Sequence, residues 1–568
     1  MKFVKLSTCF LFVVSTTAIA ADVATQKEQQ NLSADVAIQE EKTSVHLNSM
    51  DVINILVKEG VITKQRAEEL IQSVAAEKIS DDIEEHKQDS ENDTKLDAKI
   101  VRVPYIPDFV SKQIRDEVRL SLREEVVTDV IGQAKHERWG VPDALPGWVN
   151  RISFKGDFRL RYQGDIFSDL NAIPDNIYFD PQAVNDARSF SPDQSFFHNI
   201  TEDEHRLRAR LRLAMNAKVT EGVKVGMRIA TGSKNNPAST NKTLGSSFRP
   251  YELVLDRAFI KMQSEIKDHT FIGGRMPNPW ISTDLLWDSD LNFDGLAYKY
   301  RPLQSDDMFD EDRIFDTFVT FGAFPLDEVA LSSDDKWLFG FQSGLNWSFD
   351  NQDRLDIVIS YYDYTNIEGE KNSPDSNLLD YTSADLLGSG NTLFNIANSL
   401  SDPDDTLLAL ASDYNIVNFL VKYNISKFAP VNIDLTMDYV KNVGYKQADV
   451  LERSGGSGGL IGVYGNSNGE AKDTGYQFKL DIGWPTLNKR GNWKTSIAYK
   501  YLERDAVIDI FTDSDFRGGG TDVQGYILQG SYAFDDNTWT TFKLISADEI
   551  DGAPYGRETV QFDLNATF

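Results

Sequence analysis

Cysteine is almost absent: Cys9 is the single one among 568 residues. It lies in an N-terminal segment with the features of a secretory signal peptide: Lys2 and Lys5, a short apolar run, and a small-residue cleavage site at Ala18–Ala20. The chain after residue 20 is therefore expected to lack disulfides, thiolate metal sites and cysteine nucleophiles. Leu6–Cys9 resembles a lipoprotein box, but it precedes the apolar run, so lipidation is not expected.

Positive charge is also scarce, with 58 Lys and Arg against 88 Asp and Glu and a formal net charge of −30. So acidic a chain repels nucleic acid, which excludes that class of partner. After the signal peptide there is no apolar run of about eighteen residues, so no transmembrane helix is expected.

Enzyme signatures are missing as well. The histidines beyond residue 150 are His198, His205 and His269, and they show no metal-ligand spacing. No nucleophile-elbow serine motif accompanies them. We expect no enzymatic activity, no catalytic residue, no metal and no cofactor.

The part before residue 152 is expected to be a series of short segments. Val110 to Val130 repeat an apolar residue every four positions, which is not a heptad seam, so this helix is expected to pack on a barrel rim. Oligomerisation through it is the alternative. The expected segments are a signal peptide (1–20), a flexible leader (21–47), a helix-turn-helix segment (48–79), a charged linker (80–103), an amphipathic helix (104–138) and a connector (139–151).

From Ile152 onward the apolar residues alternate with period two, the pattern of β-strands with one apolar face. Each candidate strand has about ten residues, the length that a tilted strand needs to cross a bilayer. We expect sixteen strands: 152–163, 204–217, 222–231, 252–263, 268–276, 293–301, 315–324, 337–349, 354–364, 414–424, 430–440, 475–484, 491–503, 523–535, 538–548 and 558–568.

The last strand has the clearest pattern, with an apolar face that ends on the aromatic residue Phe568. A half-buried edge strand of a soluble sheet would alternate in the same way. The connections favour a membrane barrel, because short ones such as 220–222 alternate with long ones such as 365–413. The expected fold class is all-β: an antiparallel transmembrane β-barrel of about sixteen strands over 152–568, with an N-terminal periplasmic helical region. The terminal Phe568 resembles the signal that barrel-assembly machinery reads.

Several short motifs occur in a fixed order along the chain: Leu47–Ala76, Arg102–Pro107, Glu137–Pro142, Gly156–Arg161, Arg206–Leu213, Gly273–Asn278 and Asn292–Gly295. Together they resemble the putative-porin family of Gram-negative outer membranes. The resemblance implies a water-filled channel across the outer membrane for passive diffusion of small hydrophilic solutes or ions, and it does not name the solute.

The most informative charges lie on the second expected strand, where Arg206, Arg208, Arg210 and Arg212 share one face. Arginine on the lipid face at the bilayer midplane costs roughly 2–4 kcal/mol, so this row is expected to line the lumen. The first strand is expected to place three further cations beside it: Lys155, Arg159 and Arg161. These pore-lining residues either sort ions at the narrow part of the pore or form a solvated face balanced by acids such as Asp157 and Glu204.

The third long connection, 277–292, is the candidate constriction loop, in which Asp284, Asp288 and Asp290 are expected to face the arginines. An external loop that binds divalent cations and lipopolysaccharide is the alternative.

The expected partners are outer-membrane lipid, lipopolysaccharide and the assembly machinery, with a homotrimer and peptidoglycan contact through the N-terminal helices as further hypotheses. A surface adhesion or structural barrel, and an outer-membrane barrel enzyme, are the alternative functions.

Overall fold

The computed structural model describes residues 151–171, 178–190, 196–264, 268–302, 315–330, 332–349, 351–402, 404–462 and 468–568. The chain divides into two compact units, 1–123 and 124–568, and every described residue belongs to the second. The segments expected between residues 1 and 150 lie outside the described residues. Among the described residues, no helix is long and apolar enough to span a membrane.

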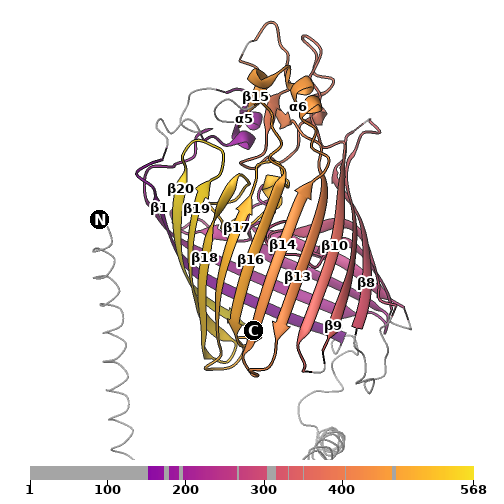
Figure 1. Ribbon diagram of the computed structural model, residues 1–568, viewed down its shortest axis with the longest axis vertical. Helices are drawn as coiled ribbons and strands as arrows, with labels where there is room; N and C mark the ends of the chain where they lie inside the picture. The colour runs from indigo at the N-terminus through magenta and orange to yellow at the C-terminus, as the bar shows by residue number, and fades with distance from the viewer. Residues whose placement is uncertain are drawn as a thin grey trace, which may run out of the picture. The chain divides into compact units, whose positions relative to one another are not determined.

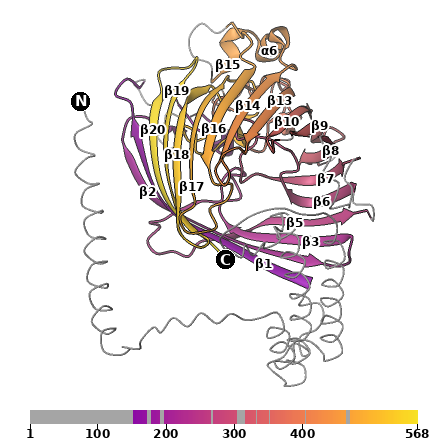
Figure 2. The same ribbon diagram turned by 60° about the horizontal axis from the view of Figure 1, so that its bottom comes forward.

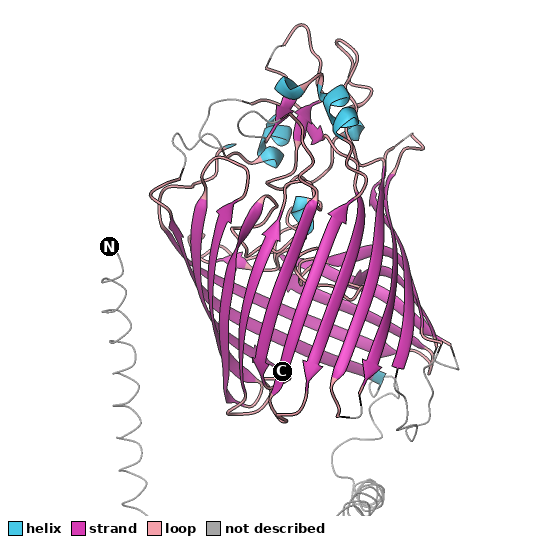
Figure 3. Cartoon of the chain, in the orientation of Figure 1, coloured by secondary structure: helices cyan, strands magenta, loops and turns pink. Residues whose placement is uncertain are grey.

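Sixteen antiparallel strands form one closed barrel, which confirms the expected fold and strand number (Figures 1 and 3). Each strand pairs with the next along the chain, and the last pairs with the first. Their bounds are β1 Ile152–Phe167, β2 Glu204–Lys218, β3 Val223–Thr231, β5 Leu253–Gln263, β6 His269–Pro277, β7 Asn292–Tyr300, β8 Phe315–Asp327, β9 Lys336–Ser348, β10 Arg354–Thr365, β13 Asn415–Ile425, β14 Asn432–Asn442, β16 Thr474–Gly483, β17 Trp493–Leu502, β18 Val523–Asp535, β19 Thr538–Glu549 and β20 Gly556–Thr567.

The ring closes between β1 and β20. Their ladder runs from Phe167 opposite Arg557 to Asp157 opposite Thr567. The last residue extends it, because the Phe568 N–H donates to Gly156 O at 3.0 Å and the Gly156 N–H donates to Phe568 O at 2.7 Å. The barrel therefore has no open sheet edge at this seam, as a membrane-spanning sheet requires.

Alternation along each strand separates an apolar outer face from a polar inner one. On β2, Leu207 and Leu213 are 51% and 44% exposed on the outside, although both are apolar. On β20, Phe562 and Leu564 are exposed in the same way, while Gln561 and Asp563 between them are buried inside. A sheet with this outer face is stable only where the apolar side chains avoid water, as they do in lipid.

The two ends of the barrel differ in their connections. At the short-turn end lie 219–222, 349–353 and 536–537, and the C-terminus ends there as well (Figure 1). At the same end, the connection between β7 and β8 is longer than the short turns expected there.

The connections at the long-loop end carry further elements. They contain β4 (Lys242–Thr243), α5 (Pro181–Ala187), α6 (Gln447–Ser454) and the 3-10 helices η4 (Asp380–Thr382), η5 (Ser457–Gly459) and η6 (Asp509–Phe511). A separate small sheet is formed by β11 (Leu393–Asn395), β12 (Leu408–Leu410) and β15 (Leu460–Ile461).

Candidate functional site

The β6–β7 hairpin leaves the barrel wall before its neighbours end. β5 pairs with β6 only as far as Ala258 opposite Arg275, and β7 pairs with β8 only as far as Leu296 opposite Ala323. Among the described residues, the ladder beyond these pairs continues only within the hairpin itself. The hairpin tip and its loop, 278–291, are thus free to bend away from the wall.

Two glycines lie at the point of departure. Gly274 and Gly295 are opposite each other in the hairpin and have φ values of +103° and +140°, which favour glycine. A Cβ at Gly274 would collide with Ala258 O, and one at Gly295 would collide with Ala323 O. Both the backbone conformation and the close approach to the neighbouring strands therefore require glycine here.

Loop 278–291 lies inside the barrel and reaches strands far from its own hairpin. The backbone N–H of Ile281 donates to Gln342 Oε1 on β9 at 2.9 Å, and Gln342 Nε2 donates to Ile281 O at 3.0 Å. Farther along, the Thr283 hydroxyl donates to Asp438 on β14 at 2.5 Å. Figure 3 shows loop segments inside the ring of strands. The loop therefore narrows the lumen.

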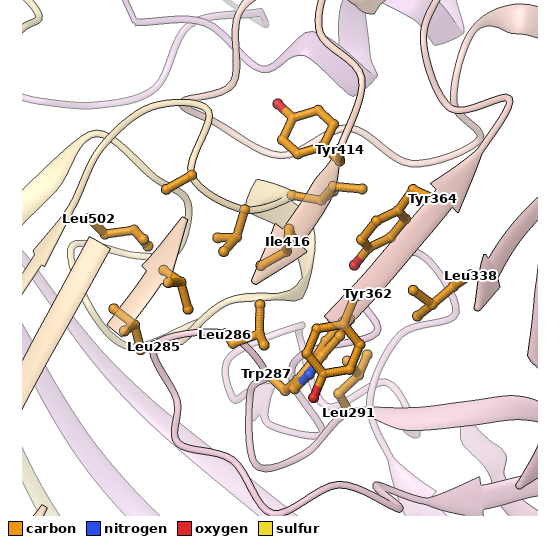
Figure 4. Close-up of a cluster of buried hydrophobic side chains, with 14 of the residues drawn as sticks. Leu285, Leu286, Trp287, Leu291, Leu338, Tyr362, Tyr364, Tyr414, Ile416 and Leu502 are labelled. Carbon is orange, nitrogen blue, oxygen red and sulfur yellow. The ribbon is translucent and has the colours of Figure 1, made fainter. Parts of the chain in front are cut away.

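Apolar packing holds this loop in place. Leu285, Leu286, Trp287 and Leu291 from the loop are all at most 5% exposed. They join a buried cluster whose wall members include Leu338, Tyr362, Tyr364, Ile416 and Leu502 (Figure 4). Full burial of a leucine contributes about 1.5–3 kcal/mol, so the cluster is strong enough to fix the loop.

The three loop carboxylates have different partners. Asp290 accepts from Arg212 Nη1 at 2.9 Å and lies 3.5 Å from Arg210 Nη1. Asp284 instead accepts from Gln477 Nε2 at 2.9 Å and lies 3.9 Å from Lys500 Nζ. The structure thus brings only Asp290 to the arginines.

Asp288 connects the constriction loop to another long loop. Its carboxylate accepts from the Ser514 N–H and from the Asp290 N–H, each at 2.8 Å. Its own N–H donates to Phe511 O at 2.8 Å. Burial raises the pKa of Asp288 to about 7, and the charge of Asp513 acts in the same direction.

The other two loop acids stay ionised at neutral pH. Burial acts to raise the pKa of Asp284, but the charge of Lys500 outweighs it and holds the pKa below its usual range. Burial likewise opposes the charges of Arg210 and Arg212 at Asp290, and the arginines again keep the pKa low. Of these three loop acids, Asp288 alone is therefore poised to change charge near neutral pH.

The β2 arginines lie on the inner face, and most of them are paired with a carboxylate. Arg206 forms an ion pair with the fully buried Asp165. Arg210 and Arg212 share Asp157 at 3.1 and 2.8 Å. Arg208 differs, because its Nη1 donates to the neutral Gln163 Oε1 at 3.1 Å.

The β1 cations occupy the same inner face. Arg161 is 3% exposed and pairs with Asp563 at 2.7 Å and with Asp515 at 2.8 Å. Arg159 Nη2 donates to Asn241 Oδ1 at 2.5 Å. Lys155 lies opposite Ala214, nearer the short-turn end, and is exposed.

A second loop, 503–522, also lies inside the barrel, and the sequence alone does not predict this. Asp513 contacts Lys500 Nζ at 3.1 Å, and Asp515 contacts both Arg161 and, at 3.7 Å, Lys543. The charges of Arg161 and Lys543 keep the pKa of Asp515 low although burial opposes them. The alternation of residues along strands carries no information on which long loop folds inward, so no sequence pattern marks this loop.

In the described residues no group of three His, Cys, Asp or Glu side chains could hold a metal ion.

The comparisons with known proteins assign the family. The model of the putative-porin family matches residues 47–568, nearly the whole chain. The chain belongs to the putative-porin family. With its closed barrel, this porin is an outer-membrane channel protein, and its family and fold are those of a channel rather than of an enzyme. No curated protein matches its sequence.

Several solved structures resemble this porin at low identity. OprB of Pseudomonas putida is 10% identical, with 74% of this chain and 95% of that chain covered and a TM-score of 0.41. The outer membrane channel DcaP of Acinetobacter baumannii is 13% identical, with 73% and 97% covered and a TM-score of 0.34. OmpF of Salmonella typhi, in a complex with daunomycin, is 10% identical, with 73% and 97% covered and a TM-score of 0.36. The assignment rests on the family match.

Proposed function

We propose that small hydrophilic solutes and ions diffuse through a water-filled lumen that loop 278–291 narrows, past a wall formed by the β1 and β2 cations. The observation that carries this proposal is the contact of Asp290 with Arg210 and Arg212. This contact brings the acidic loop 278–291 next to the basic wall, so that both negative and positive charges act on a passing ion.

Among the β2 arginines, Arg208 contributes most to the net positive field of the wall. The carboxylates of Asp157, Asp165 and Asp290 largely cancel the other three β2 arginines, whereas Arg208 faces a neutral glutamine. At physiological salt a charge acts over only about 8 Å, so its effect stays within the narrow part of the pore. The lumen near Arg208 therefore concentrates anions.

The test is the reversal potential of single channels under a salt gradient. Arg208→Gln is expected to move it towards cation preference, and glutamine at all four of Arg206, Arg208, Arg210 and Arg212 is expected to move it further. Arg354→Gln is a matched control, because Arg354 lies at the short-turn end of β10 and is paired with Asp356 at 2.7 Å. An unchanged reversal potential in folded Arg208→Gln would show that the arginine wall lies away from the conducting path.

The surroundings of the barrel complete the proposal. Its outer face contacts lipid and lipopolysaccharide, assembly machinery recognises Phe568, and the N-terminal region lies in the periplasm, where its helices contact peptidoglycan. The protein has no enzymatic activity. Three copies of it assemble as a homotrimer. Crosslinking in cells before mild-detergent electrophoresis tests the trimer, and a monomer band alone would contradict it.

A further inference from the structure

Three lysines form a row across adjacent strands at the short-turn end. Lys218 on β2 is directly opposite Lys224 on β3, and Lys224 is directly opposite Lys261 on β5. Neighbouring strands are about 4.8 Å apart, so the row spans about 10 Å. Figure 2 shows β3 and β5 side by side in the wall.

The row faces the lumen. Val225 beside Lys224, and Ile260 and Met262 on either side of Lys261, are apolar and 36%, 40% and 46% exposed on the outer face. Because strand side chains alternate, Lys224 and Lys261 point inward. The row is therefore open to the water in the pore.

This row is scarcely neutralised. Among the residues that the structure describes, no carboxylate forms an ion pair with Lys224 or Lys261, and Lys218 has only the fully exposed Glu221, at 3.8 Å. Lys299 on the inner face of β7 adds a further cation on the same side of the barrel. By contrast, Lys479 on β16 and Lys494 on β17 form ion pairs with Asp481 at 3.3 and 3.6 Å.

Like charges directly opposite each other destabilise a sheet, so an uncompensated row has a cost that a bound anion removes. We propose that Lys218, Lys224 and Lys261 form an anion-binding site for small divalent oxyanions, with inorganic sulfate as the probe. An oxyanion with two charges accepts hydrogen bonds from two or three ammonium groups at once. The site rests on the proposed pore for access, but it is distinct from the arginine wall.

The test compares two variants that each remove two positive charges from the inner face. One is Lys224→Gln with Lys261→Gln, and the other is the control Lys479→Gln with Lys494→Gln. Sulfate is titrated into chloride, and its half-effect concentration on single-channel conductance is measured. The first variant should raise that concentration about tenfold, because sulfate loses two ion pairs with lysine ammonium groups. The control is expected to leave it near the wild-type value.

Two results would overturn the site. The first is a half-effect concentration of sulfate that is equal in the wild type and in the variant with Lys224→Gln and Lys261→Gln. The second is an equal shift in both variants, which would show that sulfate responds only to the overall charge of the lumen. If the folded wild type does not conduct, the proposed pore fails instead. Calorimetric titration of sulfate into the detergent-purified barrel then still tests the site, because it needs no ion flow. Heat-modifiable gel mobility confirms that each variant is folded.

Discussion

At the scale of residues, the lumen stabilises its charges by pairing acidic loops with basic strands. Asp290 and Asp515 extend from different loops to Arg212 and Arg161 at 2.9 and 2.8 Å. A charge removed from water without such a partner costs several kcal/mol, so each pair also fixes the loop that carries it. The pore's electrostatic field and the positions of its loops are therefore set by the same contacts.

Asp288 should make ion preference depend on pH. Its pKa of about 7 means that it loses most of its charge between about pH 8 and pH 6, while Asp284 keeps its own. Loss of a negative charge in the constriction should move the reversal potential towards anion preference on acidification. We expect Asp288→Asn to remove most of this shift and Asp284→Asn to retain it. A full shift in Asp288→Asn would show that another group titrates.

The same group has a defined effect on stability. The usual aspartate pKa is about 3.9, so the folded state binds this proton more tightly than the unfolded state. The stabilisation from Asp288 is thus present at low pH and is lost as pH rises from about 4 through 7. Asp288→Asn should flatten that part of the pH profile of thermal unfolding.

The charged face of β2 could be predicted from sequence because strand alternation fixes it. Arg206 to Arg212 occupy every second position, and four lipid-facing arginines would be too costly. Their partners could not be predicted. Asp290 meets the arginines while Asp284 meets Lys500, and that difference depends on the path of a loop with no periodic pattern.

At the scale of elements, the inward bend of the β6–β7 hairpin depends on its two paired glycines. Gly274→Ala or Gly295→Ala should cost about 1–3 kcal/mol through backbone strain and should displace loop 278–291. Single-channel conductance should then rise, because the loop narrows the lumen.

Gly273→Ala is the matched control for this hairpin. Gly273 is adjacent to Gly274, has no positive φ, and would place its Cβ 3.1 Å from the Leu296 side chain rather than against backbone. It should conduct like the wild type. Wild-type conductance in folded Gly274→Ala and Gly295→Ala would contradict the proposed hinge.

The strands themselves followed closely from sequence, while the elements in the loops did not. For β10 and β18 the sequence predicts 354–364 and 523–535, and the structure has Arg354–Thr365 and Val523–Asp535. Period-two alternation is a local signal, so it marks such strands well. The sheet of β11, β12 and β15 joins distant loops through strands of two or three residues, too short to show any period.

At the scale of the whole molecule, the seam between first and last strands determines closure. Phe568 continues the β20 ladder with two backbone hydrogen bonds to Gly156, and its ring covers that glycine. Deleting Phe568 should remove both hydrogen bonds and lower the amount of trypsin-resistant barrel in cells. Phe562→Ala, which removes another lipid-facing ring from β20, should assemble at nearly normal levels. Equal assembly of both variants would leave no special role for the terminal residue.

Conductance in a planar bilayer tests most directly whether this porin forms an open, water-filled channel. Purified, folded barrel should produce discrete current steps that increase with salt concentration. Channels of this kind should appear only with the form that shows heat-modifiable gel mobility. Folded barrel that inserts into the bilayer and carries no current would contradict the account.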